Sequence, residues 1–200
     1  TFEFMDFSWS GLGSYMTGSC TNNLFLNCDW HDNYDPMTNY ENADGLNFEG
    51  VRSGGSNTVR GCRFWNNSDD GLDIYDNDSY LLVDNCWAWN QGYEEDGVGI
   101  AADGNGFKLG PTTISAKSTV LRKVINCIAY HNQSWGYNQN GDALCNMELY
   151  NNIAYNNSFG SNWGGGYNFN VDGVAYYIKN NISYNDEPEA ATLGVKTNVN

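Results

Sequence analysis

The chain has 200 residues, with 24 acidic against 9 basic side chains and a formal net charge of −15. This length suits one compact domain or one short repeat array, and the charge excludes nucleic acid as the expected partner, because phosphate binding needs clusters of Lys and Arg. No stretch approaches the ~20 apolar residues that cross a membrane, and the 15% aromatic content argues against disorder.

A three-residue phrase recurs six times along the chain, each time followed within a few residues by an aromatic residue and then by Asn. The copies are Leu26-Asn27-Cys28, Arg60-Gly61-Cys62, Asp84-Asn85-Cys86, Ile125-Asn126-Cys127, Tyr150-Asn151-Asn152 and Lys179-Asn180-Asn181. The Asn residues that follow are Asn33, Asn66, Asn90, Asn132, Asn156 and Asn185. We expect Asn at the same corner of successive coils to stack in a ladder of amide hydrogen bonds.

A second phrase follows the first five times, as a Gly and then an apolar-polar-apolar run. The runs are Leu46-Asn47-Phe48, Leu72-Asp73-Ile74, Phe107-Lys108-Leu109, Tyr137-Asn138-Gln139 and Tyr167-Asn168-Phe169. The apolar residues alternate over a few positions between Gly, Asn and Asp, which is a strand-and-turn pattern. The shortest intervals between the phrases are 11 residues (Cys62 to Asp73) and 13 residues (Asp73 to Cys86), which sum to 24.

Short strands at a period of about 24 residues predict an all-β fold, a parallel β-helix in which each coil packs on the previous one. We expect a single domain over residues 1–200. The longer intervals predict loop insertions at about 29–45, 87–106 and 110–122. Long loops in a solenoid generally emerge on one face and carry function.

Four Cys fall at one equivalent position of the coil: Cys28, Cys62, Cys86 and Cys127. We expect them to form a column of small buried side chains rather than a disulfide framework. Cys20 and Cys145 lie off this column, and the sequence leaves open whether either forms a disulfide.

The middle residue of each second phrase should point outward while its neighbours point inward. The five middle residues, which we call the outer column, are Asn47, Asp73, Lys108, Asn138 and Asn168. Strand spacing would separate neighbours by about 4.8 Å. Lys108 is the only cation among them. Asp44 and Asp70 stand three residues before Asn47 and Asp73, and Asp69 precedes Asp70, so four carboxylates should converge beside Lys108.

Carboxylates held this close repel one another, and a bound cation would remove the conflict. Oxygen-only ligands suit Ca²⁺, which takes 6–8 oxygens, better than Zn²⁺, which prefers His or Cys. The plainer interpretation is that Asp-Gly pairs only make turns. It loses weight here because the acids of two coils lie in register beside a lone Lys.

Three strings, at residues 41–45, 66–73 and 104–110, resemble the calcium-dependent polysaccharide lyases of family 9, which are right-handed parallel β-helices acting on pectate or rhamnogalacturonan. The resemblance extends from about Gly11 to Asn185. It implies that Asp44, Asp69, Asp70 and Asp73 hold a calcium ion and that Lys108 is the base of a β-elimination. It also implies an anionic uronate polymer as substrate and a secreted, extracellular protein.

The sequence departs from this family in two ways. Members of the family normally carry further N-terminal coils and a cap, and we expect this chain to lack them and to be a fragment, to have a fused neighbour, or to associate end to end through uncapped coils. Asn47 stands where a basic residue is expected, and the same face has few other basic residues. The identity of the polymer therefore stays open.

Two other functions also stay open. A hydrolase of the polygalacturonase type shares the fold and could use Asp69 and Asp70 as acid and base, but its Gly-His-Gly and Arg-Ile-Lys signatures are missing, and we expect His31 and His131 at turns or on the surface. A non-catalytic β-solenoid could bind sugar or form a filament. Its seven Trp would then stack on sugar rings, although they could equally serve packing.

Overall fold

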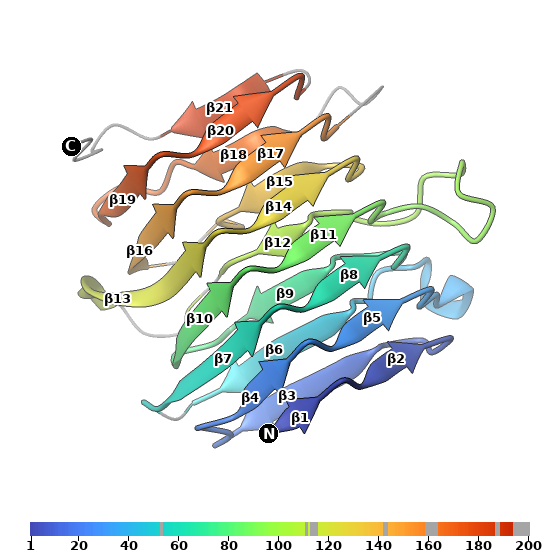
Figure 1. Ribbon diagram of the computed structural model, residues 1–200, viewed down its shortest axis with the longest axis horizontal. Coiled ribbons are helices and arrows are strands. Elements are labelled where there is room, and N and C mark those ends of the chain that lie inside the picture. Colours follow the sequence, from blue (N-terminus) through green and yellow to red (C-terminus); the bar gives the residue numbers. More distant parts are fainter. Residues whose placement is uncertain are drawn as a thin grey trace.

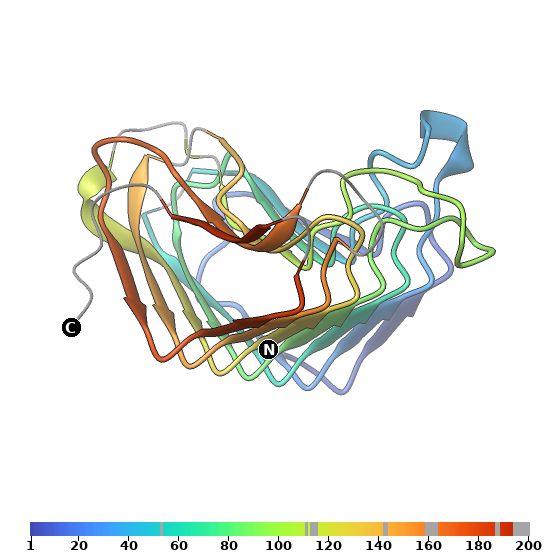
Figure 2. The same ribbon diagram turned by 90° about the horizontal axis from the view of Figure 1, so that it is seen from above.

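The computed structural model describes residues 1–52, 54–110, 112, 116–141, 144–158, 164–186 and 189–193. The chain forms a parallel β-helix in which three sheets run the length of the molecule (Figure 1). Figure 2 shows the coils stacked on one another, with the blue loop that contains the short helix and the green loop projecting on the same side. The all-β parallel β-helix predicted from the repeats is confirmed. None of the described residues forms a helix long and apolar enough to cross a membrane.

Each sheet takes one strand from every coil, and its neighbouring strands are parallel. Sheet A contains β1 (Phe2–Glu3), β4 (Leu24–Leu26), β7 (Ser56–Arg60), β10 (Tyr80–Asp84), β13 (Ala116–Ile125), β16 (Cys145–Tyr150) and β19 (Tyr176–Lys179). Sheet B contains β2 (Asp6–Ser8), β5 (Asp29–His31), β8 (Arg63–Trp65), β11 (Trp87–Trp89), β14 (Ile128–Tyr130), β17 (Ile153–Tyr155) and β20 (Ile182–Tyr184). Sheet C contains β3 (Ser14–Gly18), β6 (Leu46–Val51), β9 (Leu72–Tyr75), β12 (Phe107–Lys108), β15 (Trp135–Asn138), β18 (Gly165–Phe169) and β21 (Glu189–Leu193). A 3-10 helix spans Pro36–Thr38.

Sheet B is the part of the fold that the repeat pattern missed. Its strands are three residues long and begin directly after the first phrase, as in β5, where Trp30 is fully buried between two partly exposed neighbours. One inward side chain is too few to show an alternation. The predicted insertions at 29–45 and 87–106 therefore begin too early, because β5 and β11 occupy their first residues, and β13 covers most of the one predicted at 110–122.

The inner ladder of amides runs along the corner after sheet B. Its members are the amides of Asn33, Asn67, Gln91, Asn132 and Asn157, and the carboxylate of Asp186 accepts at the end of the ladder. Successive members lie 34, 24, 41, 25 and 29 residues apart, so the predicted period of 24 is the length of the shortest coil. The longer coils contain inserts, mainly between sheets B and C.

The predicted Asn ladder is right in kind but not in every residue. Asn33 and Asn132 belong to the inner ladder, whereas the other four predicted members form the outer side of the same corner. Those four are Asn66, Asn90, Asn156 and Asn185, with φ of 54°, 54°, 58° and 57°. Asn adopts this left-handed conformation more readily than most residues. Each corner therefore uses one residue to turn the chain and the next to bond between coils.

Replacing Asn132 by Ala is expected to lower the free energy of unfolding by about 2–4 kcal/mol. The buried Asn132 side chain donates to the Ala88 carbonyl and the Asn157 side chain, and accepts the N–H of Gln91, so Ala would strand all three partners. Denaturant titration measures the change. Asn42→Ala, at an exposed site, is the control and should stay within about 0.5 kcal/mol of the parent. An equal loss in both variants would contradict a structural role for the ladder.

The predicted cysteine column is confirmed. Cys28, Cys62, Cys86 and Cys127 are fully buried free thiols in the core. The backbone N–H of Cys28 donates to Sγ of Cys62 at 3.4 Å, so the column also links coils. Cys145 is likewise a buried free thiol, and Cys20 packs against the core.

The aromatic side chains mainly pack against one another. On the outer face of sheet B, Trp65 stacks on Trp89 with ring centroids 5.0 Å apart, and His31 stacks on Trp65 at 4.1 Å. Neighbouring rings cover these faces, so the faces are closed to a sugar. His31 lies in β5 rather than in a turn, held by Asp32 and Asp6, while His131 occupies an exposed corner as predicted.

Candidate active site

The outer column lies on the outer face of sheet C, in the predicted register. Asn47 pairs with Asp73, Asp73 with Lys108, and Lys108 with Asn138, which in turn pairs with Asn168. The side chains point away from the core but are not exposed: Asn47 retains 7% of its accessible surface, Asp73 5% and Lys108 7%. Turns and inserts leading into β6, β9 and β12 enclose them. Burial makes their charges interact more strongly than they would on an open surface.

Glycine before each strand of sheet C brings the coils close enough to form this site. A Cβ on Gly45 would lie 2.5 Å from the carbonyl oxygen of Gly71, and one on Gly71 would lie 2.7 Å from that of Gly106. Neither backbone oxygen can move without breaking the stack. The Gly of the second phrase therefore sets the spacing of the acidic turns that precede it.

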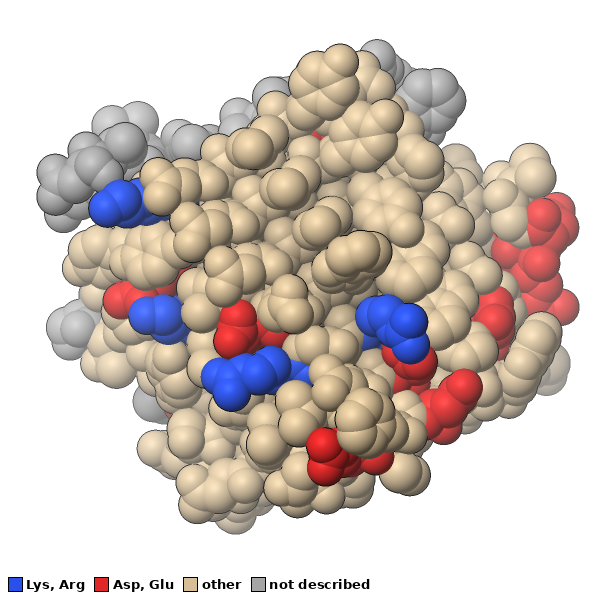
Figure 3. Space-filling model, in the orientation of Figure 1, with Lys and Arg blue, Asp and Glu red and all other residues tan. Residues whose placement is uncertain are grey.

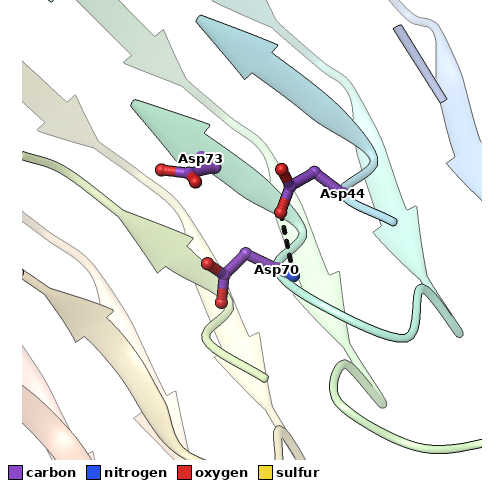
Figure 4. A group of neighbouring side chains, drawn as sticks. All are labelled: Asp44, Asp70 and Asp73. Carbon is purple, nitrogen blue, oxygen red and sulfur yellow. Dashed lines mark hydrogen bonds between the residues drawn. The ribbon is translucent and has the colours of Figure 1, made fainter. Parts of the chain in front are cut away.

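Three carboxylates from two coils converge on one point (Figure 4). Asp44 and Asp70 lie in the turns before β6 and β9, and Asp73 lies in β9 itself. Each offers an oxygen within 4.8 Å of the others. Oδ1 of Asp44 accepts the backbone N–H of Asp70 at 3.1 Å, and its Oδ2 accepts Nδ2 of Asn47 at 2.8 Å. We call these three residues the central cluster.

Asp69 lies in a second, adjoining group rather than in the central cluster. It shares Asp70 with that cluster and gathers with Asp103, again with oxygens within 4.8 Å. Oδ1 of Asp69 accepts the backbone N–H of Asp103 at 3.1 Å. All four predicted acids thus meet in one patch, and Asp103 joins them from the insert before β12. Sequence reasoning missed Asp103 because an insert has no repeat register to align it.

Lys108 faces three of these carboxylates. Its Nζ lies 2.8 Å from Oδ2 of Asp70, 3.3 Å from Oδ2 of Asp73 and 3.2 Å from Oδ2 of Asp103. The side chains of Lys108, Asp70 and Asp73 are buried, whereas that of Asp103 is 65% exposed. The amine therefore lies at the boundary between the buried acids and the solvent.

Electrostatics at the site are unbalanced. Burial, with the nearby Asp70 carboxylate, raises the pKa of Asp44 to about 7. Burial, with Asp70 and Asp44, raises the pKa of Asp69 to about 10, and burial raises the pKa of Asp73 well above its ordinary range. Burial alone would lower the pKa of Lys108, but the surrounding carboxylates outweigh it and raise that pKa. One ammonium group is too little positive charge for these acids.

The donor set fits a calcium ion. Oδ1 of Asp73 and Oδ1 of Asn47 are buried acceptors with no hydrogen-bond donor, and the two residues are direct neighbours on adjacent strands. A buried acceptor without a partner costs about 1–3 kcal/mol, which a cation at this point would offset. The two acidic groups supply only carboxylate oxygens, as Ca²⁺ prefers.

Comparison with known proteins places the chain in a family. The family model described as "Pel9A-like, right handed beta helix region" matches residues 1–181. Pectate lyase L of Dickeya dadantii (strain 3937) is 35% identical over 178 residues, which cover 88% of this chain and 40% of that protein. Pectate lyase PEL9 of Emericella nidulans is 34% identical over 163 residues, covering 73% and 39%. The chain spans about two-fifths of the length of these relatives.

Two solved structures share the fold. The crystal structure of pectate lyase Pel9A superposes with a TM-score of 0.69 and 28% identity, covering 97% of this chain and 48% of that one. A rhamnogalacturonan lyase superposes with a TM-score of 0.67 over 96% of this chain and 59% of its own, and at 22% identity it supports the fold alone. The resemblance to family 9 seen in the motifs is confirmed. The chain belongs to the Pel9A-like right-handed β-helix family.

Proposed function

We propose that this chain carries the active site of a calcium-dependent polysaccharide lyase, which cleaves a uronate polymer by β-elimination with Lys108 as the base. The observation that carries the proposal is the position of Nζ of Lys108, 2.8 Å from Asp70, beside buried carboxylates that lack enough positive charge. The pectate lyase names of the relatives support the substrate class. The uronate polymers of plant walls lie outside cells, so we propose that the protein acts there.

The residues divide the work between binding and proton transfer. Asp44, Asp69, Asp70 and Asp73 would hold the calcium ion. A bound calcium ion would supply the positive charge that offsets the substrate carboxylate and makes the neighbouring proton more acidic. Lys108, as the free amine, takes the proton from C5 of the uronate. The C5–H electrons form the C4–C5 double bond, the C4–O bond breaks, and the departing oxygen is protonated.

Asp103 has a separate part in this scheme. Its exposed carboxylate lies 3.2 Å from Nζ of Lys108, on the solvent side of the amine. It therefore orients the amine between the buried acids and the solvent. Its backbone N–H also fixes the Asp69 carboxylate.

Activity is expected to rise with pH between about pH 7 and pH 10. Only the unprotonated amine acts as a base, its fraction rises with pH through the pKa, and an ordinary Lys has a pKa of about 10.4. Burial lowers the pKa of Lys108, but Asp70, Asp73, Asp69 and Asp103 outweigh this effect and raise it, which moves the rising limb of the profile toward alkaline pH. The pH profile of kcat/KM at saturating calcium measures this. An optimum near about pH 5 would contradict Lys108 as the base.

An elimination assay on a panel of uronate polymers, with and without chelator, tests the whole proposal. Elimination creates a double bond conjugated with the carboxylate, so ultraviolet absorbance should rise with calcium and stop with chelator. New reducing ends without absorbance would instead indicate a hydrolase that uses Asp69 and Asp70. Binding of polymer without any product would indicate a non-catalytic sugar-binding solenoid.

A further inference from the structure

A cavity lies on the side of the later coils, lined by Asp103, which contacts Lys108, and by Asn138, the neighbour of Lys108 on the next strand. It has a volume of about 390 Å³ and lies over β15 and β18 of sheet C, lined among others by Asn105, Gln133, Ser134, Asn138 and Asn168. Ligand pockets generally measure about 300–1,000 Å³, so this cavity is large enough for a small group such as one sugar ring. The Asp103 carboxylate, which contacts Lys108, also lines it. The cavity and the proposed reaction centre are therefore continuous.

The cavity wall is an ordered row of amides. Nδ2 of Asn168 donates to Oδ1 of Asn138 at 3.1 Å, and Nδ2 of Asn138 donates to Oδ1 of Asn105 at 3.0 Å. Asn105 in turn donates its backbone N–H and its Nδ2 to Oδ1 of Asp70, at 2.6 and 2.8 Å. Asn138 and Asn168, which are partly exposed, each use one side-chain N–H in this row and keep a second for a ligand. Neutral donors and acceptors at fixed positions suit sugar hydroxyl groups.

Among the described residues that line this cavity there is no Lys or Arg, and Asp103 is the one charged residue. Of the other basic side chains that the structure describes, five lie on sheets A and B: Arg60, Arg63, Arg122, Lys123 and Lys179. On that face most basic side chains lie beside acidic ones (Figure 3). Arg52 pairs with Asp76, and the buried Arg122 donates to backbone carbonyls. A uronate carboxylate in the cavity would face Asp103, and the one cation close to Asp103, Lys108, already faces Asp70, Asp73 and Asp103.

We propose that this cavity is a subsite for an uncharged sugar ring, next to the uronate bound at the central cluster. The inference rests on the proposed lyase function and narrows its substrate. The preferred polymer has a charged uronate at the cluster and an uncharged neighbour, which is either a neutral sugar or an esterified uronate. An array of adjacent free uronates fits the cavity poorly, because one carboxylate would be desolvated against an acid.

The test compares kcat/KM for three polymers in saturating calcium: polygalacturonate, partly methyl-esterified polygalacturonate, and a backbone in which galacturonate alternates with rhamnose. The alternating or the esterified polymer should exceed polygalacturonate by at least about tenfold. A preference for the alternating polymer identifies the ring as a neutral sugar, and a preference for the ester identifies it as an esterified uronate. Equal or faster cleavage of polygalacturonate overturns the inference but leaves the lyase function intact.

A variant that adds a positive charge checks the location of the subsite. Asn168→Arg adds a cation to the cavity at a partly exposed position, so it should shift the preference toward polygalacturonate by about tenfold, whereas Asn168→Gln should keep the parent's preference. An unchanged preference in Asn168→Arg would place the discrimination elsewhere and overturn the inference.

Binding provides a readout that is independent of turnover. Calorimetry with Lys108→Ala protein, calcium and short oligosaccharides should show tighter binding of those with an uncharged ring. If the parent protein cleaves none of the polymers but this binding preference is observed, the lyase proposal fails and the subsite stands. Tighter binding of the fully charged oligosaccharide overturns the subsite.

Discussion

Lys108→Arg is expected to bind calcium like the parent protein and to lose turnover by about 10²–10⁴-fold. Arg keeps the positive charge that faces Asp70, Asp73 and Asp103, so the acids stay compensated. Its guanidinium group is not deprotonated in proteins, so it cannot take the C5 proton. The variant therefore separates the role of Lys108 as a base from its role as a cation. Initial rates of absorbance increase and calcium calorimetry measure the two roles.

Lys108→Ala completes this test. It should lose turnover to a similar extent while its calcium affinity is kept or rises, because the carboxylates lose the ammonium group that competes with the metal ion. Lys123→Ala is the matched control, since Lys123 pairs with Glu148 on sheet A, away from the site. Substantial turnover in Lys108→Arg would refute the assignment of the base, and loss of calcium binding in Lys108→Ala would show that Lys108 supports the metal site instead.

The outer column could be predicted because its sequence signal is periodic. Alternation places Asp73 and Lys108 on the same face, and the Gly before each strand fixes the close approach of the coils. The same rule relates Asp44 to Asp70, each two residues before the first residue of its strand. A one-residue shift in register would have moved all these side chains into the core, so the buried apolar neighbours effectively specify the site.

Other features had no periodic signal. Asp103 comes from an insert, and its contacts with Lys108 and Asp69 depend on how that insert folds back over sheet C. The burial of the outer column also depends on inserts, since alternation alone predicts exposed side chains. The strands of sheet B could not be predicted because each contributes a single inward residue, such as Trp30. These features depend on which segments cover a strand in the folded chain, and strand periodicity does not reveal that.

The burial that sequence reasoning missed changes the expected energetics of the central cluster. A folded-state pKa raised above its unfolded value means that a carboxylate favours folding when protonated and opposes folding when ionised. Asp73 is in this position, because burial raises its pKa well above the ordinary range. Its contribution to stability is therefore greatest in acid and is lost as the pH rises through the folded-state pKa. Near neutral pH and without metal, the central cluster therefore lowers the free energy of unfolding. A bound cation would remove this destabilisation, and its removal would favour binding.

Asp73→Asn is expected to stabilise the metal-free protein and to weaken calcium binding by at least about 10–100-fold. The amide has nearly the shape of the carboxylate but carries no charge, so it relieves the repulsion from Asp44 and Asp70 and removes one anionic ligand. Thermal unfolding with chelator should show a higher Tm than the parent. Added calcium should raise Tm less than in the parent, because stabilisation by a ligand follows RT ln(1 + [L]/Kd).

Asp172→Asn is the matched control for both effects, the higher Tm in chelator and the smaller rise of Tm with calcium. Asp172 lies in an exposed turn between β18 and β19, so the same chemical change there should leave both Tm values near those of the parent. A parent-like calcium shift in Asp73→Asn would remove Asp73 from the ligand set. A lower Tm in chelator would mean that Asp73 stabilises the fold through its ion pair with Lys108, and that repulsion within the cluster is not what a cation relieves.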